Sequence, residues 1–181
     1  PLPVEIEIPP ETLEEQAEMD FSEPAKRSDI SPSDDSVAAA ASALAEAKEP
    51  LIWAGEGALS SGCAPSLMRL AEHLQAPIVC AGEAKGTVSD RHYLAMGVPN
   101  WRRDSLDDLL DRADVILAVG ASLARSALRP EQSVVLVDVD ATQSDDRVAV
   151  EVIGDVLPGV EALEIAVLGS TPSRSSRRDE F

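Results

Sequence analysis

The chain has 181 residues and a formal net charge of −18, and 44% of the residues are hydrophobic although only 3% are aromatic. This length allows one domain with a core of Val, Ile, Leu and Ala, plus a linker or tail. The acidic charge argues against nucleic acid or an anionic membrane surface as partner, because both need concentrated Lys and Arg. The acid excess is otherwise typical of a solubilising surface.

The small number of cysteines and histidines bears on metal binding and on the cellular compartment. Cys63 and Cys80 are the only cysteines, and His73 and His92 are the only histidines, which argues against a structural zinc site. Two unpaired thiols are typical of a reducing cytosol, so we expect a cytoplasmic location. No apolar run approaches the length of a membrane span, and we expect no signal peptide.

The first 34 residues do not resemble a self-contained unit. In residues 1–10, Val4, Ile6 and Ile8 alternate with acids, which indicates a strand bracketed by prolines. A lone strand has no pairing partner, so we interpret it as the end of a preceding domain. Residues 11–34 are acidic and rich in Pro and Ser, which predicts a linker with one helical turn near Thr12–Glu18.

Alternating helix and strand patterns follow from residue 35 to residue 169. Ser33-Asp-Asp-Ser36 is a helix-start signal, and apolar residues then recur at helical spacing. Asp104 can cap a later helix. The tail, residues 170–181, is of low complexity and is predicted to be disordered. The predicted strands are Leu51–Ala54, Pro77–Cys80, Val115–Val119, Ser133–Val137 and Val150–Ile153, and the predicted helices carry Val37 to Ala45, Leu67 to Leu74, Leu106 to Ala113 and Val156 to Val167.

Continuous apolar strands that alternate with amphipathic helices predict an α/β fold. We expect a Rossmann-like doubly wound parallel sheet of five to six strands with helices on both faces. Four strands end at Gly55, Gly120, Asp138 and Gly154. In such sheets the carboxyl ends of the strands form the ligand crevice, so we expect any ligand there.

The glycine-rich segment after the first strand reads Gly55-x-Gly57-x-x-x-x-Gly62 and precedes a helix pattern that starts at Pro65. Ser60 stands where the third glycine of the dinucleotide fingerprint belongs, and no Gly-Lys-Ser/Thr follows. Two interpretations stay open. The glycines make a tight turn without room for Cβ atoms, or they form a loop that contacts a nucleotide, with free helix N–H groups facing it. We expect Gly57→Val to remove ligand binding while leaving the fold largely intact.

Polar residues follow two other strands. Asp138 and Asp140 come after a buried strand, where a carboxylate can accept hydrogen bonds from a ribose or can cap a turn. Ser122 lacks a nucleophile-elbow motif, and the histidines occupy ordinary positions, so a Ser/His/Asp triad is not expected. The candidate ligand-binding residues are Gly55, Gly57, Gly120, Ser122, Asp138 and Asp140, with no catalytic and no metal-ligating residue.

Several motifs together resemble a known family. They are Pro50-Leu-Ile-Trp-Ala-Gly-x-Gly-Ala-x-Ser-Ser-Gly62, Leu70-Ala-Glu-His-Leu-Gln-Ala-Pro-Ile-Val79, Ala84-Lys85-Gly86, Asp90-x-His92, Ala113-Asp-Val-Ile-Leu-Ala-Val-Gly120, Val135-Leu-Val-Asp-Val-Asp140 and Gly154-Asp155. In this order and spacing they are similar to the central domain of thiamine-diphosphate-dependent enzymes of the acetolactate synthase, pyruvate oxidase and decarboxylase type. The resemblance runs from residue 3 to about residue 168.

The resemblance implies a three-domain parent that binds thiamine diphosphate and Mg²⁺ and is a homo-oligomer. The pyrimidine-binding domain supplies a glutamate, and the diphosphate-binding domain supplies Gly-Asp-Gly and a later Asn. Neither is found in this chain, because Gly154-Asp155 is followed by Val156 and Asn100 is the only asparagine. We therefore expect no thiamine diphosphate binding by this chain alone, and partners in the missing pyrimidine- and diphosphate-binding domains.

The resemblance also implies that the central domain binds FAD or ADP, or that it is structural. Residues 121–126 lack the acidic and basic residues of flavoprotein members, and residues 141–146 depart from the usual Pro-x-Glu-Ile-Gly. Both departures weaken the case for FAD. The alternative is a free-standing adenine-nucleotide or flavin-binding module with no thiamine chemistry.

Overall fold

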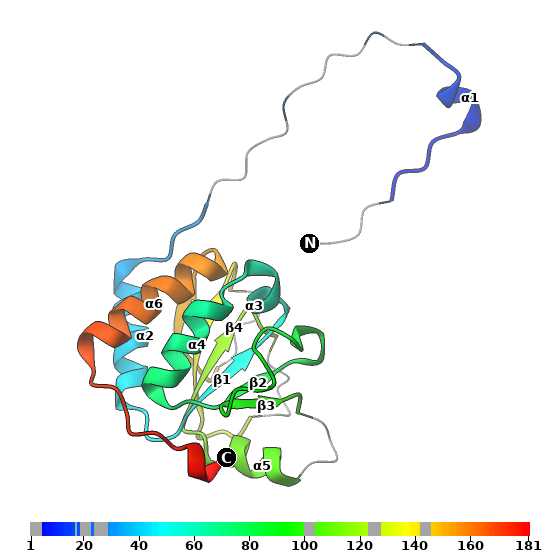
Figure 1. Cartoon of the computed structure of the whole chain (residues 1–181). Helices are drawn as coiled ribbons and strands as arrows, with labels where there is room; N and C mark the ends of the chain where they lie inside the picture. The colour runs from blue at the N-terminus through cyan, green and yellow to red at the C-terminus, as the bar shows by residue number, and fades with distance from the viewer. Residues whose placement is uncertain are drawn as a thin grey trace.

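The computed structural model describes residues 5–16, 18, 23, 29–99, 104–122, 128–141 and 146–181, with the backbone alone for Asp104 and Ser105. Its centre is a six-stranded sheet of order β3-β2-β1-β4-β5-β6 (Figure 1). All five strand pairings are parallel. This is the strand order of a doubly wound dinucleotide-type fold, so the predicted class is confirmed. The strands are β1 (Pro50–Ala54), β2 (Ile78–Cys80), β3 (Ala95–Gly97), β4 (Val115–Val119), β5 (Ser133–Asp138) and β6 (Val148–Ile153).

Helices connect the strands. Ser33 begins the second helix as predicted, because its Oγ accepts the Ser36 N–H over 3.1 Å. Gly62, with φ +74°, ends the third helix in the left-handed conformation that glycine adopts without strain. The helices are α1 (Pro10–Leu13), α2 (Asp34–Glu46), α3 (Glu56–Ser61), α4 (Ala64–Leu74), α5 (Asp104–Arg112) and α6 (Val156–Ser170), with short 3₁₀ turns at Gly82–Ala84 and Arg178–Glu180.

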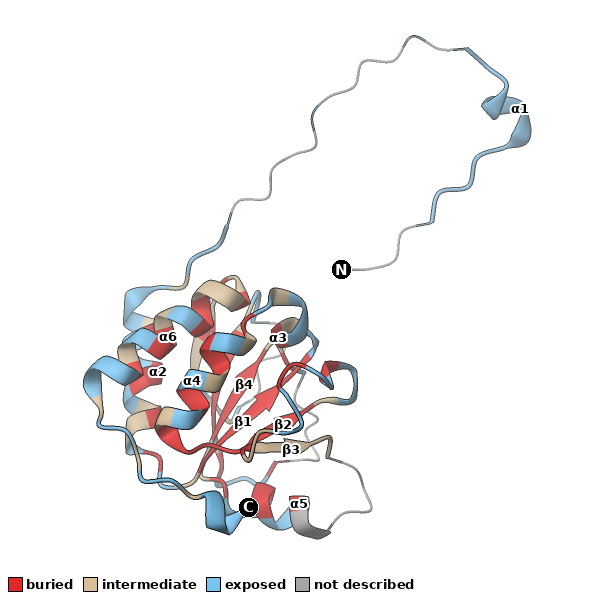
Figure 2. Cartoon of the chain, in the orientation of Figure 1, coloured by how far each residue is buried: buried red, intermediate tan, exposed pale blue. Residues whose placement is uncertain are grey.

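The two faces of the sheet are covered unequally. Helices α2, α4 and α6 pack on one face, where Leu44, Leu67 and Leu163 join one buried cluster with strand residues. On the other face α5 contributes Leu106 and Leu109 to a second cluster. Figure 2 shows the central strands buried between these layers. The sheet is therefore buried on both faces, which explains its almost wholly apolar strands.

Three elements of the structure differ from the prediction. Strand β3 was not predicted, because its three residues lack β-branched side chains and lie half-buried at the edge of the sheet. Helix α3 occupies the segment predicted as a glycine-rich loop, so the chain becomes helical at Glu56 rather than near Pro65. In the linker, the helical turn forms at Pro10–Leu13, slightly before the predicted position.

Residues 29–33 of the linker contact the domain where β6 ends. Ile30 N–H donates to Asp155 Oδ2 over 3.0 Å, and Asp155 N–H donates to Ile30 O over 2.7 Å. Gly154 lies so close that a Cβ atom there would be 2.7 Å from Ile30 O. The chain thus enters the domain beside the carboxyl end of β6.

Helices α4 and α5 end at the amino end of the sheet, the end at which the parallel strands begin. Their last carbonyl groups lack partners within the helix. Gln75 Nε2 donates to Glu72 O over 2.6 Å at the end of α4. Gln132 Nε2 donates to Leu110 O and Ala113 O over 2.5 and 3.0 Å at the end of α5. A glutamine near the start of a strand therefore supplies the donor in both cases, Gln75 shortly before β2 and Gln132 directly before β5.

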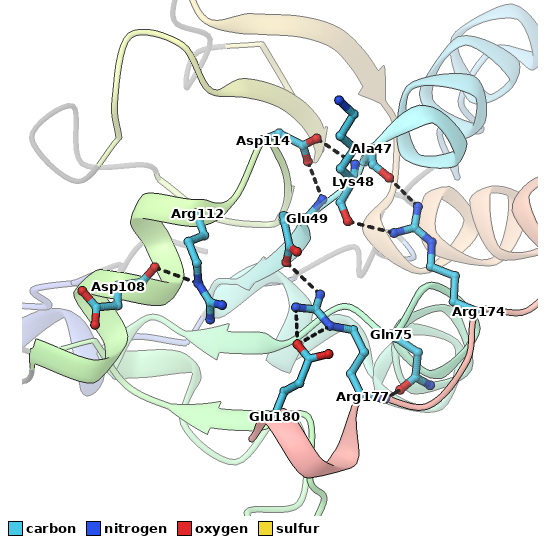
Figure 3. A network of polar contacts seen from close by, with 10 residues as sticks. All are labelled: Ala47, Lys48, Glu49, Gln75, Asp108, Arg112, Asp114, Arg174, Arg177 and Glu180. Atoms are coloured by element: carbon cyan, nitrogen blue, oxygen red, sulfur yellow. Dashed lines mark hydrogen bonds and ion pairs between the residues drawn. The ribbon is translucent and has the colours of Figure 1, made fainter.

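The C-terminal segment corrects the prediction of a disordered tail. Residues 171–181 lie across the amino end of the sheet and make hydrogen bonds to residues far away in the sequence (Figure 3). Arg174 donates to Ala47 O, and Arg177 pairs with Glu49. Composition alone predicts disorder here, but arginine side chains that reach fixed acceptors hold the segment in place.

Candidate ligand site at the carboxyl end of the sheet

The sheet order changes direction between β1 and β4, which places this pair at the topological switch point. Gly55 and Gly57 follow β1, and Gly120 follows β4. Asp138 ends β5, two strands away from β1. These four predicted site residues therefore share the carboxyl end of the sheet, as expected from the topology.

The three glycines pack against one another. Gly55 N–H donates to Val119 O over 2.9 Å, and Gly57 N–H donates to Gly120 O over 3.0 Å. A Cβ atom on Gly57 would lie 2.7 Å from Gly120 Cα, and one on Gly120 would lie 2.7 Å from Ala58 N. Gly120 also has φ +52°. The lack of room for Cβ atoms is confirmed, and its cause is contact between two backbone segments of this chain.

This contact corrects two expectations. The first amides of α3 do not face a crevice, because Gly57 N–H is bonded to Gly120 O and Ala58 N–H to Gly55 O. The expectation that Gly57→Val leaves the fold intact is wrong, since valine side-chain atoms would overlap the Gly120 backbone.

Asp138 is half-buried at the end of β5. Its Oδ1 accepts the Val139 N–H over 2.7 Å, and its backbone carbonyl accepts the Gly154 N–H over 2.9 Å. Burial raises the pKa of the Asp138 carboxyl, although the hydrogen bond from Val139 opposes this. The side chain therefore caps its own turn, which was one of the two open interpretations.

Asp140 and Ser122 are exposed beside this site. The loops that continue from them, residues 142–145 and 123–127, lie outside the described residues. The predicted departures from the flavin-binding pattern fall largely in these loops. The structure thus brings Ser122, Asp138 and Asp140 to one end of the sheet.

Trp53 is a further polar group that sequence reasoning missed. The residue is only 7% exposed, and its indole Nε1–H has no hydrogen-bond partner among the residues that the structure describes. Trp53 shares a buried cluster with Ala118 and Leu136, and Leu136 lies two residues before Asp138 on the same face of β5. The available signal was the tryptophan within an apolar strand. A buried tryptophan N–H usually has a hydrogen-bond partner, so this position could have been examined as a candidate polar contact.

The histidines form hydrogen bonds within the fold, and the two cysteines are buried. His73 Nε2 lies 3.0 Å from Thr171 O, and His92 Nε2 lies 3.0 Å from Glu72 Oε1. Burial raises the pKa of the Cys63 and Cys80 thiols. Within the described ranges, no three His, Cys, Asp or Glu residues gather as metal ligands, and no helix is long and apolar enough to cross a membrane.

Comparison with known proteins identifies the family. Residues 37–163 match the family described as thiamine pyrophosphate enzyme, central domain. The chain is 32% identical over 177 residues to the probable 2-ketoarginine decarboxylase of Pseudomonas aeruginosa, covering 90% of this chain and 30% of that protein. It is 27% identical over 170 residues to the acetolactate synthase large subunit of Corynebacterium glutamicum, covering 86% of this chain and 27% of that protein.

The fold has a relative among solved structures. A protein from Mycobacterium smegmatis assigned to the thiamin diphosphate-dependent enzymes superposes with a TM-score of 0.69 at 18% identity, over 86% of this chain and 32% of that protein. The chain spans between 24% and 30% of the length of the first curated relatives that it matches. The alternative of an unrelated nucleotide-binding module gains no support from these matches. The chain belongs to the thiamine pyrophosphate enzyme central domain family and resembles the acetolactate synthase branch of it.

Proposed function

We propose that this chain is the architectural central domain of a thiamine-diphosphate-dependent enzyme of the acetolactate synthase type. In this role it connects and positions the pyrimidine- and diphosphate-binding domains of a homo-oligomeric parent and takes no part in the chemistry. One observation carries the proposal. The switch point, where such sheets bind ligands, is closed by contact between Gly57 and Gly120 of the chain itself.

The described residues do not fit thiamine diphosphate and Mg²⁺. The single Gly-Asp pair is Gly154-Asp155, and the Asp155 carboxylate accepts the Ile30 N–H. That aspartate begins α6 and fixes the linker, which is a structural task. In the parent, the cofactor and its metal are held by the domains that supply the missing glutamate and the Gly-Asp-Gly motif.

Calorimetric titration of the chain with thiamine diphosphate and Mg²⁺ tests this proposal. We expect no saturable heat at millimolar ligand, with or without the metal. The matched control is a single-chain relative that contains all three domains, under the same conditions. Tight binding that depends on Mg²⁺ would overturn the architectural role.

A second candidate function is binding of an adenine nucleotide, ADP or the adenine half of FAD. It is favoured by one observation, the unpaired Trp53 N–H and the half-buried Asp138 carboxylate on the same face. A ligand would then lie over the ends of β4 and β5, because the approach from α3 is blocked. The residues that we assign to this candidate are Gly120, Ser122, Asp138 and Asp140, whereas Gly55 and Gly57 lie on the blocked side, where the Gly120 backbone fills the space beside them.

Titration with ADP and FAD separates the two candidates. Saturable binding that Asp138→Asn weakens at least about tenfold would favour the nucleotide function, since a lost charge-assisted hydrogen bond has this effect. The matched control is Asp155→Asn, which changes a carboxylate at the end of a different strand. Equal loss in both variants, or no binding to the unmodified chain, would remove the nucleotide candidate.

A further inference from the structure

The C-terminal strap, residues 171–181, is anchored first on α4. Arg174 N–H donates to His73 O over 3.0 Å, and His73 Nε2 lies 3.0 Å from both Thr171 O and Thr171 Oγ1. The family match ends at residue 163, before the strap begins. The strap is therefore a feature of this chain beyond the matched domain.

Arg174 then caps the end of α2. Its guanidinium donates to Ala47 O over 2.6 Å and to Lys48 O over 3.4 Å (Figure 3). It also donates to Leu44 O over 3.4 Å. A cation at this end also interacts favourably with the helix dipole. Arg174 is separated from Ala47 by 127 positions in the sequence.

Among the described residues, the side-chain donor at the end of α2 comes from much farther along the chain than those at the ends of α4 and α5. The next two backbone N–H groups, of Lys48 and Glu49, donate to the Asp114 carboxylate over 2.7 and 2.9 Å. Gln75 caps α4 from 3 positions away, and Gln132 caps α5 from 19 and 22 positions away. Arg174 supplies the corresponding donor for α2 from the strap, 127 positions away.

Arg177 makes the second anchor, three residues further along the strap. Its N–H donates to Gln75 Oε1 over 3.0 Å, and its guanidinium lies 2.8 Å from Glu49 Oε2. Glu180, within the strap, pairs with the same guanidinium over 2.7 Å. The Arg177 side chain is only 15% exposed, whereas the Glu49 side chain is 41% exposed, so the arginine side of this contact is the one withdrawn from water.

We propose that the amino end of the sheet is a docking site for an Arg-x-x-Arg segment, and that the occupant is the chain's own strap. The first subsite is the set of carbonyl groups at the end of α2, which accepts Arg174. The second subsite is Glu49 with Gln75, which accepts Arg177. Charge favours the occupant, because the strap carries three arginines and two acids in a chain of net charge −18.

Nuclear magnetic resonance on the full chain tests the proposal. In Arg174→Ala/Arg177→Ala we expect the ¹H–¹⁵N heteronuclear NOE of residues 171–181 to fall to values of a free chain. Exchange of the amide at position 177 should accelerate by about tenfold or more, since its bond to Gln75 depends on docking. The signals of β4 should stay unchanged, which shows that the domain remains folded.

Two variants control this result. Arg178→Ala removes a guanidinium that lies 5.4 Å from the Tyr93 ring centroid, and we expect the strap to stay docked. Arg174→Lys keeps the charge but loses the guanidinium fork, so the amide at position 174 should exchange faster than in the unmodified chain. A strap that stays ordered in the double variant, or that Arg178→Ala releases equally, would overturn the proposal.

A peptide of residues 171–181 added to the double variant shows whether the site accepts an occupant in trans. We expect amide shifts in residues 44–49 and 75, and none with a peptide in which both arginines are alanine. Absence of shifts with the native peptide would exclude a docking site.

Discussion

At the carboxyl end of the sheet, backbone packs directly on backbone, and Gly57 and Gly120 approach too closely for a Cβ atom on either residue. At the amino end, long side chains span the gap, and Arg174, Gln75 and Gln132 each donate to carbonyl groups near helix ends. The cause lies in helix polarity. The carbonyl of Gly120 satisfies the Gly57 amide in the first turn of α3, whereas a helix C-terminus needs donors that side chains carry. Substitutions that add side-chain atoms should therefore destabilise the fold at the carboxyl end. Substitutions that remove a side-chain donor should destabilise it at the amino end.

The largest effect that we expect is from Gly57→Val at the carboxyl end. The new side chain would overlap Gly120, so the free energy of unfolding should fall by about 3 kcal/mol or more. Chemical denaturation of both proteins measures this change in the free energy of unfolding. Gly82→Ala is the matched control, because a Cβ atom there meets nothing within 4 Å. Equal stability of the two variants would contradict the backbone contact.

At the amino end we expect a smaller loss from Gln132→Leu. The substitution keeps the side-chain bulk but removes the side-chain donor of Leu110 O and Ala113 O and the acceptor of the Arg129 N–H, which costs about 1–3 kcal/mol. Denaturant unfolding measures this change, with the neighbouring exposed Glu131→Gln as control. If Gln132→Leu were as stable as the control, side-chain capping would not hold this end together.

Between the two ends, Arg69 and Glu164 join α4 to α6, with Nη2 to Oε2 at 2.9 Å. The Arg69 guanidinium lowers the pKa of the Glu164 carboxyl, so this pair stabilises the fold above the ordinary glutamate pKa of about 4.3 and loses that effect as pH falls. Glu164→Gln should lower the unfolding temperature by a few degrees at pH 7 and by less near pH 3. A loss that stays constant across this range would show that the charge is not involved.

The smallest effect concerns Asp138, and its pH dependence has the opposite sign. Burial raises the pKa of this carboxyl, so its ionisation costs stability as pH rises above the ordinary aspartate value of about 3.9. Asp138→Asn keeps an acceptor for Val139 N–H and should change the free energy of unfolding at pH 7 by less than about 1 kcal/mol. Unfolding midpoints of both proteins at pH 4 and pH 7 measure this. A difference in the free energy of unfolding between the two proteins that grows toward pH 4 would contradict this prediction.

Sequence patterns predicted the layered part of the fold. The strand of residues 115–119 was placed with its bounds, since an apolar β-branched run that is buried on both sides has few other structures available. Strand β3 and helix α3 were missed, because three edge residues and a six-residue glycine-containing helix lack a clear period.

Long-range polar contacts account for the remaining differences. The strap was predicted to be disordered because composition describes only local tendencies, whereas Arg174 reaches Ala47 across 127 positions. At the candidate site, the absence of room beside Gly55 and Gly57 was predicted, but the partner that fills it, Gly120, follows another strand. Whether Ser122, Asp138 and Asp140 contact a ligand stays a prediction.

The anchoring of the two flanking segments has a mechanical consequence. Ile30 is fixed beside the carboxyl end of β6, and Arg174 and Arg177 are fixed at the opposite end of the sheet. Strands of five or six residues separate these points by roughly 17–20 Å. Tension applied between the two segments would therefore load the domain along its strands, in shear, and the Ile30–Asp155 and arginine contacts would bear the force before the sheet does.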